Sequence, residues 1–107
     1  MFIIADERKH HQLEILRTAR IWQTVLIPCN FPTNVTVAWK YRRTYRSEVV
    51  HITTNGLIAD EFQDRFQLEP NGLLVSDVQP SDAGWYTCHQ KHTGRTRQII
   101  RLSVPCK

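Results

Sequence analysis

The sequence lacks any long run of apolar residues, and it lacks a leader with a basic start. None of its 107 residues lie in a stretch approaching the roughly 18 consecutive apolar residues of a membrane-spanning helix. Residues 1–5 are too short for a signal peptide and lack a basic start. We therefore expect a one-domain fragment of a longer chain whose signal and membrane anchor are missing. Hydrophobic residues at 41% and charged residues at 22% are ordinary for a globular domain.

Residues 82–88, with the sequence Asp-Ala-Gly-Trp-Tyr-Thr-Cys, impose the strongest constraint on the rest of the chain. Side chains alternate along a strand, so Tyr86 and Cys88 share one face. Pro80 and Gly84 mark the corner that leads into this strand. Two more core strands are predicted by the same alternation, with inward residues Val25, Ile27 and Cys29 in one and Val37, Trp39 and Tyr41 in the other.

The sequence resembles the immunoglobulin superfamily in three features: Cys29, a tryptophan ten residues later, and the Asp-x-Gly-x-Tyr-x-Cys motif of residues 82–88. The resemblance covers residues 13–104. It implies an all-β sandwich of two antiparallel sheets, with a disulfide between Cys29 and Cys88 and with Trp39 packed against it. In the chain-entropy model, closing a loop of this size stabilises the fold by roughly 4 kcal/mol.

The spacing after Trp39 favours a variable-set (V-set) domain over the shorter constant set. The 45 residues between Trp39 and Trp85 leave room for the strands that the family names C′, C″, D and E. Arg65 and Asp82 match positions that often pair in this family, although two solvated charges are the alternative. Further strands are predicted at residues 12–17, 48–52, 65–68, 72–78 and 98–104.

Antibody and T-cell receptor variable domains usually carry a Phe-Gly-x-Gly bulge near the last strand, and this chain has none. The closer resemblance is to V-set domains of cell-surface immune receptors, co-receptors and adhesion molecules. A disulfide-bonded domain matures in an oxidising compartment, so we expect it on the extracellular side of the plasma membrane or secreted. Asn34 begins the only Asn-x-Ser/Thr sequon, which marks either a glycosylated surface loop or a chance triplet.

Catalysis, cofactors and metal binding are not expected. With Cys29 and Cys88 paired, Cys106 is the remaining thiol, and nothing beside it could pre-organise a base or an oxyanion hole. His89 and His92 have a His-x-x-His spacing, but an offset of three on a strand points the two rings to opposite faces.

Function is then expected from a surface, and alternation predicts which one. The positions between Trp39, Tyr86 and Cys88 and their inward neighbours face outward. In the V-set, the strand with Trp39 (C), the strand with Cys88 (F), the last strand (G, residues 98–104) and strand C′ share one sheet. Cations on these strands therefore converge on a single exposed face, in line with the net charge of +4. The residues expected to bind a partner there are Lys40, Arg42, Tyr45, His89, Lys91, Arg97, Ile99 and Arg101.

A concentrated positive face favours an acidic protein partner and disfavours stacking against an identical copy. Ile99 and Tyr45 are the expected apolar anchors. Three alternatives stay open: the charges only solvate the domain, the domain serves cell adhesion, or it binds sulfated polysaccharide through counterion release. The face is expected to lack interleaved aromatic residues, which argues against nucleic acid as a partner.

Cys106 is left over in a chain expected to be extracellular. It follows the last strand, where residues 105–107 are expected to begin a stalk or another domain. It therefore predicts an interchain disulfide and a homodimer, unless its partner is a cysteine elsewhere in the parent protein. Residues 1–12 are expected to be a flexible lead-in.

Overall fold

The regular secondary structure of the described residues is almost entirely β-strand. A computed structural model describes residues 14–31, 35–44, 46–93 and 95–105, so the expected lead-in at residues 1–12 lies outside it. The elements are β1 (Glu14–Thr18), β2 (Val25–Pro28), β3 (Val37–Arg42), β4 (Val50–His51), β5 (Thr53–Thr54), β6 (Leu57–Ile58), the 3-10 helix η1 (Asp60–Phe62), β7 (Phe66–Glu69), β8 (Gly72–Val75), the 3-10 helix η2 (Pro80–Asp82), β9 (Gly84–Gln90) and β10 (Thr96–Ser103). Among these residues, no helix is long and apolar enough to cross a membrane.

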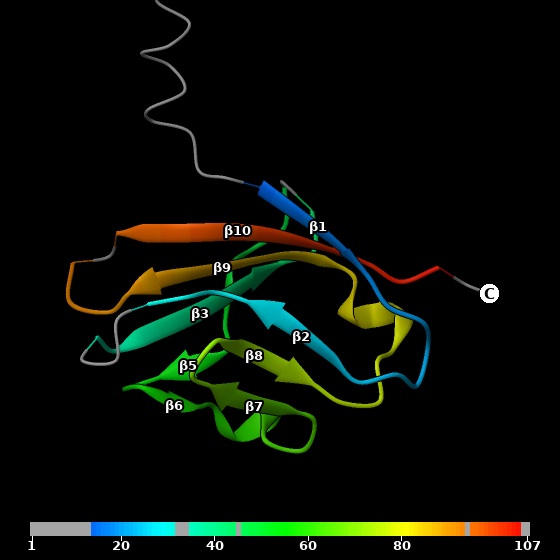
Figure 1. The fold of residues 1–107 in the computed structure, drawn as a ribbon, viewed down its shortest axis with the longest axis horizontal. Helices are drawn as coiled ribbons and strands as arrows, with labels where there is room; N and C mark the ends of the chain where they lie inside the picture. Colours follow the sequence, from blue (N-terminus) through cyan, green and yellow to red (C-terminus); the bar gives the residue numbers. More distant parts are fainter. Residues whose placement is uncertain (1–13, 32–34, 45, 94, 106–107) are drawn as a thin grey trace, which may run out of the picture.

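The strands form two facing sheets and a small hairpin (Figure 1). One sheet has the order β1-β10-β9-β3-β4, the other has the order β2-β8-β7, and β5 and β6 form a separate pair. The predicted all-β sandwich is therefore confirmed. One pair of strands departs from the antiparallel prediction, because β1 runs parallel to β10. After β1 the chain crosses to β2 in the opposite sheet instead of returning along its own sheet.

The core lies between the two sheets and is built on the inward positions of alternating strands. Trp39 and Tyr86 are each 1% exposed. The predicted disulfide between Cys29 and Cys88 is present, and it joins the end of β2 to β9. Trp39 is the cross-strand neighbour of Cys88, which places its indole beside the bridge.

Asp82 organises the corner before β9. Its carboxylate accepts hydrogen bonds from Arg65 Nη1 at 2.7 Å and Nη2 at 2.8 Å, so Arg65 and Asp82 form a bidentate ion pair. The backbone N–H of Gln79 also donates to this carboxylate, at 2.7 Å. The Tyr86 hydroxyl donates to the Asp82 carbonyl oxygen at 2.7 Å. Because Asp82 is 5% exposed, these bonds compensate the burial of a charged group.

Gly84 continues this corner and lies where a side chain could not. Its φ is 147°, and an added Cβ would lie 2.7 Å from Tyr41 Cε1 and 2.8 Å from the Arg42 carbonyl oxygen. The close approach lets the Tyr41 hydroxyl donate to the Ala83 carbonyl oxygen at 2.5 Å. The Asp-x-Gly part of the motif is therefore a packing requirement of the corner.

Several strand boundaries differ from the sequence prediction. The strand predicted at residues 72–78 ends at Val75, because Asp77 takes a φ of 50° that an extended strand does not allow. The strand predicted at residues 48–52 is reduced to β4. β1 and β10 each lie two residues or fewer from the ranges predicted for them.

The segment after β4, within the stretch expected to hold strands C′, C″, D and E, forms the hairpin β5–β6. Ile52 leaves β4 by turning inward, where it is 1% exposed and its backbone N–H donates to the Trp39 carbonyl oxygen at 3.0 Å. Asn55 and Gly56 then make the turn with φ values of 55° and 81°. This is the backbone geometry that an Asn-Gly pair favours in a two-residue hairpin loop.

Candidate functional site

The exposed face of the five-stranded sheet holds most of the residues that the sequence predicted for partner binding. Cross-strand neighbours share a face, and the register places Lys40 beside Thr87 and Thr87 beside Ile99. Two residues along, Trp85 lies beside Arg101. We call this surface the basic face and define it by Lys40, Arg42, His51, Trp85, Thr87, His89, Ile99 and Arg101.

The other predicted site residues are placed less fully. Lys91 follows β9 in an exposed turn at the margin of the basic face. Four predicted positions lie outside what the structure describes: Asn34, Tyr45, Cys106 and the side chain of Arg97. The apolar anchor at Tyr45, the glycan at Asn34 and the interchain bridge at Cys106 therefore stay predictions.

Trp85 corrects the expectation that the basic face lacks aromatic residues. It alternates with the inward Tyr86 along β9, so its ring lies on the outer surface. The guanidinium of Arg101 lies over this ring, with Cζ 5.4 Å from the centroid. A cation at this distance is attracted to the face of the indole. The alternation rule could have found Trp85, since the same rule placed Thr87 outside.

A hollow of about 270 Å³ opens on the basic face. Its lining combines apolar side chains from three parts of the chain with charged groups of both signs. The apolar residues include Val49, Trp85 and Ile99, and the charged ones are Lys40, Arg42 and Glu14. Ile99, predicted as an anchor, therefore lies in the lining of this hollow. A space of this size suits one side chain of a partner better than a drug-sized ligand.

His89 sits beside this hollow in an environment that disfavours its charged form. Its Nδ1 atom is buried and makes no hydrogen bond with any described residue. Burial is the largest cause that lowers the pKa of His89 below 6.5, followed by the charges of Lys40 and His51. His51 lies beside Lys40 across β3 and β4. At neutral pH the fixed positive charge here therefore comes from lysine and arginine rather than from His89.

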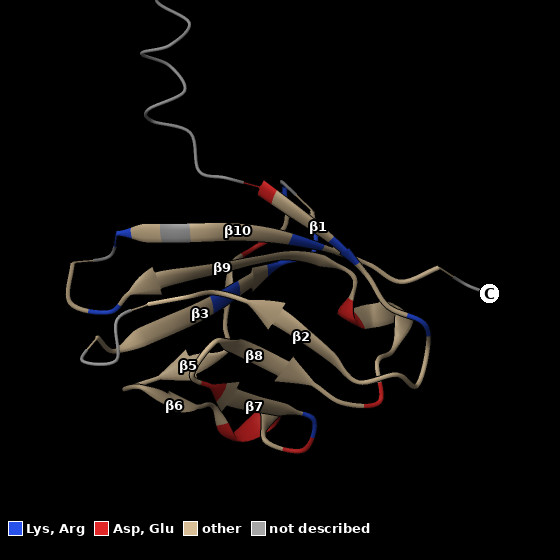
Figure 2. Ribbon diagram, viewed as in Figure 1, with Lys and Arg blue, Asp and Glu red and all other residues tan. Residues whose placement is uncertain are grey.

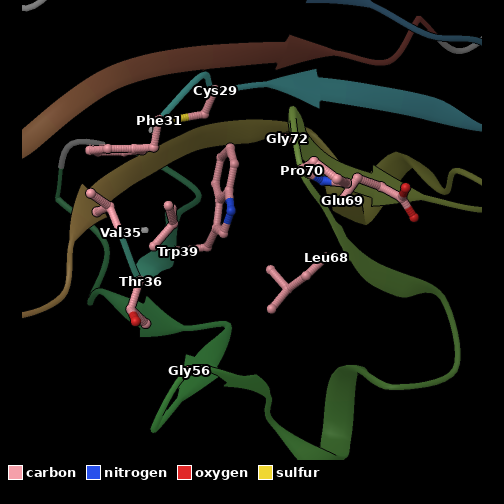
Figure 3. A pocket seen from close by; sticks show the side chains of 11 residues that line it. Cys29, Phe31, Val35, Thr36, Trp39, Gly56, Leu68, Glu69, Pro70 and Gly72 are labelled. Atoms are coloured by element: carbon pink, nitrogen blue, oxygen red, sulfur yellow. The ribbon is translucent and has the colours of Figure 1, made fainter. Parts of the chain in front are cut away.

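A second cavity, of about 420 Å³, opens between the sheets beside the disulfide (Figure 3). Side chains of Phe31, Val35, Trp39 and Leu68 line it, and they are apolar. Glu69 is the ionisable side chain of its lining, since Cys29 is in the disulfide. The cavity thus has the chemistry of a core edge and offers no set of groups for covalent catalysis.

Within residues 14–31, 35–44, 46–93 and 95–105, no three His, Cys, Asp or Glu side chains converge as metal ligands would. His92 lies in the exposed turn after β9, whereas His89 is on the strand itself.

Charge is distributed unevenly around the sandwich (Figure 2). Lysine and arginine lie on β3, β10 and β1, whereas aspartate and glutamate gather about η1 and β7 at the lower edge of the view. The exposed acids there are Asp60, Glu61 and Asp64. The net charge of +4 does not show that basic and acidic residues lie in different regions.

Comparison with known proteins identifies the fold and a range of relatives. The immunoglobulin V-set domain model matches residues 17–105. The ectodomain of the voltage-gated sodium channel β4 subunit, described as a parallel homodimer with a role in cell–cell adhesion, has a TM-score of 0.64 and 25% identity over 88% of this chain and 87% of that chain. No curated protein sequence matches the chain.

Two further solved structures share the fold at lower identity. Drosophila Semaphorin 2a has a TM-score of 0.68 and 20% identity over 90% of this chain, which spans 15% of the semaphorin chain. The extracellular fragment of Novel Immune-Type Receptor 10 from Ictalurus punctatus has a TM-score of 0.64 and 16% identity, over 87% of this chain and 99% of that one. At this identity both likenesses concern the fold alone.

Proposed function

The chain belongs to the immunoglobulin V-set family, and we propose that it is the recognition domain of a cell-surface immune receptor that binds an acidic protein through the basic face. The observation that carries the proposal is the hollow, whose lining combines the apolar side chains of Trp85 and Ile99 with the cations Lys40 and Arg42. Protein interfaces concentrate their affinity in such apolar centres, with tryptophan and arginine among the commonest hot-spot residues.

The arrangement of Arg101 and Trp85 supports a protein partner in a second way. The guanidinium over the indole limits the motion of both side chains before any partner arrives. Less conformational entropy is then lost on binding, because rigid side chains have fewer states to give up. The surrounding cations accelerate encounter with an acidic surface.

The extracellular location is part of this proposal. The disulfide between Cys29 and Cys88 favours an oxidising compartment, either secreted or on the outside of a cell. Among the described residues that define the basic face, Trp85 is the one aromatic ring, and a single ring does not make the row on which successive bases stack, so nucleic acid is not proposed as a partner.

Cell adhesion is the second candidate function. It is favoured by the likeness to the sodium channel β4 ectodomain, whose structures are described as parallel homodimers. In that case an interchain bridge at Cys106 would strengthen the assembly. A Cys106→Ser variant that stays dimeric by light scattering would show that the contact is non-covalent, whereas a monomer would assign the dimer to Cys106.

To test the proposal, the domain is prepared in a multivalent form, and its binding to a panel of cells that display extracellular proteins is measured. We expect Lys40→Glu combined with Arg101→Glu to lower apparent affinity by at least about tenfold, because both reverse the charge on the basic face. The matched control combines Arg17→Glu with Arg20→Glu, since these changes reverse two exposed cations outside the basic face and alter the net charge by the same amount.

Enzymes applied to the cells separate the classes of partner. Protease treatment should abolish binding, while enzymes that degrade sulfated polysaccharide should leave it intact. Binding that survives protease but collapses at moderate salt would overturn the proposal in favour of polysaccharide. Equal loss in the Arg17 and Arg20 control and in the basic-face variant would show that net charge, rather than this face, governs binding.

A further inference from the structure

We propose that the basic face also binds a second copy of this chain, at an acidic edge formed by Leu57, Asp60, Glu61 and Asp64. The inference rests on the proposed function, because it uses the same face, and it names the chain itself as one acidic partner. The contact would be head-to-tail, with the basic face of one copy against the acidic edge of the next.

The acidic edge has the composition that the basic face requires. Residues 57–64 contain three carboxylates and no lysine or arginine. Asp60, Glu61 and Asp64 are all exposed. The neighbouring Arg65 does not neutralise them, because its guanidinium is held by Asp82 at 2.7 Å. The edge is therefore a free patch of negative charge on a chain whose net charge is +4.

Leu57 supplies an apolar group beside these carboxylates. It lies on β6, two residues before η1, and its side chain is 70% exposed. An exposed leucine alone needs no explanation. Here it stands next to acids, and the hollow on the basic face combines apolar side chains with Lys40 and Arg42, which outnumber its one carboxylate, Glu14. Leu57 in that hollow would place carboxylates near Lys40 and Arg101, so the two surfaces match in both polarity and charge.

The positions of the two surfaces decide the kind of assembly. They belong to different parts of the sandwich: the basic face is the outer side of β3, β9 and β10, and the acidic edge follows β6 (Figures 1 and 2). One copy therefore cannot bring its own edge onto its own face. Two basic faces repel, which disfavours a two-fold face-to-face pair. Head-to-tail contacts leave an unused face and an unused edge, so they extend into larger clusters or rings.

An acidic partner protein would then compete with the acidic edge for the basic face. Clustering at high density would mask the face, and a tighter partner would release it. Self-association is expected to be weak and dependent on salt, because the charges are exposed and screened.

The test uses two variants in a Cys106→Ser background, which removes interchain disulfides. The face variant carries Lys40→Glu and Arg101→Glu, and the edge variant carries Glu61→Lys and Asp64→Lys. Sedimentation at low and physiological salt should show each variant to self-associate at least about tenfold more weakly than the parent. A mixture should form a one-to-one dimer that grows no further, because the intact edge of the face variant meets the intact face of the edge variant.

Three results would overturn the inference. They are a parent chain that stays monomeric at every concentration and salt, a mixture that stays monomeric while the parent associates, and an edge variant that associates as strongly as the parent. The proposed function is tested separately by binding to cells, which the edge variant should retain and the face variant should lose. Loss of self-association without loss of cell binding therefore separates the two proposals.

Discussion

Trp22 combines two features that disfavour a tryptophan. It lies in a turn closed by a hydrogen bond from the Gln23 N–H to the Arg20 carbonyl oxygen at 3.1 Å, and its φ is 75°. Positive φ at this turn position favours glycine or asparagine. The side chain is 68% exposed, so packing within the described residues does little to offset the backbone strain. Trp22 is thus a residue whose identity the stability of this domain does not explain.

We expect Trp22→Gly to raise the free energy of unfolding by about 1 kcal/mol, because glycine adopts positive φ without the clash of a Cβ. Urea unfolding followed by circular dichroism would measure the change. Thr24→Gly is the matched control: it is also exposed but lacks positive φ, so it should lower the free energy of unfolding. A loss of stability in Trp22→Gly would mean that the indole packs in solution.

At the scale of elements, the corner between η2 and β9 is the most constrained junction in the sandwich. Gly84 brings its backbone against Tyr41, and the hydroxyls of Tyr41 and Tyr86 satisfy carbonyl oxygens of Ala83 and Asp82. A side chain at position 84 would push β3 away from the corner and would break these bonds together. The motif thus fixes how two strands of one sheet meet.

Gly84→Ala should lower the free energy of unfolding by roughly 2–4 kcal/mol, because the methyl group clashes with backbone and ring atoms at an unfavourable φ. Gly56→Ala provides the comparison, since its φ is 81° but its added Cβ would meet only Thr36 Cγ2 at 3.4 Å. Gly56→Ala should lower the free energy of unfolding by about 1 kcal/mol, from backbone strain alone. If thermal unfolding showed the same loss of stability in both variants, the close approach at Gly84 would contribute nothing to the cost of the substitution.

The strands were predicted best where the signal in the sequence depends on neighbouring residues alone. Alternation placed β9 and the inward residues of β3 and β10 correctly, because side-chain direction along a strand depends only on position in that strand. The short strand β4 and the hairpin β5–β6 were predicted poorly. Their limits depend on the inward turn at Ile52 and on its backbone hydrogen bond to Trp39, a contact with the neighbouring strand β3 that alternation within one segment does not predict.

At the scale of the whole molecule, the disulfide joins the two sheets through residues 59 apart in sequence. Such a bridge acts mainly by reducing the freedom of the unfolded chain, so its contribution depends on the closed loop more than on local contacts. It ties the sheet that carries the basic face to the sheet behind it.

Replacing Cys29 and Cys88 by alanine should lower the free energy of unfolding by about 4 kcal/mol. Urea unfolding of the double variant against the parent would test this, with Cys106→Ser as the control that removes a thiol without opening the bridge. A loss no larger than that of the control would contradict the loop-closure account. Mass spectrometry of the unreduced parent should likewise find no free thiol at either position.

Motifs in the sequence predicted the V-set sandwich, the disulfide, and the inward Trp39 and Tyr86, and alternation within single strands predicted the cations of the basic face. Which residues of different strands become neighbours depends on how the strands pair and pack. Registers between strands placed His51 beside Lys40 and formed the hollow between Trp85, Ile99 and Val49.

The tertiary structure also separated the acidic edge from the basic face, which the net charge of +4 conceals. The physical reason is that net charge and composition are sums over the chain, whereas a binding surface depends on positions in space. Turn lengths and packing across the sandwich set those positions, and neither is encoded by any single strand.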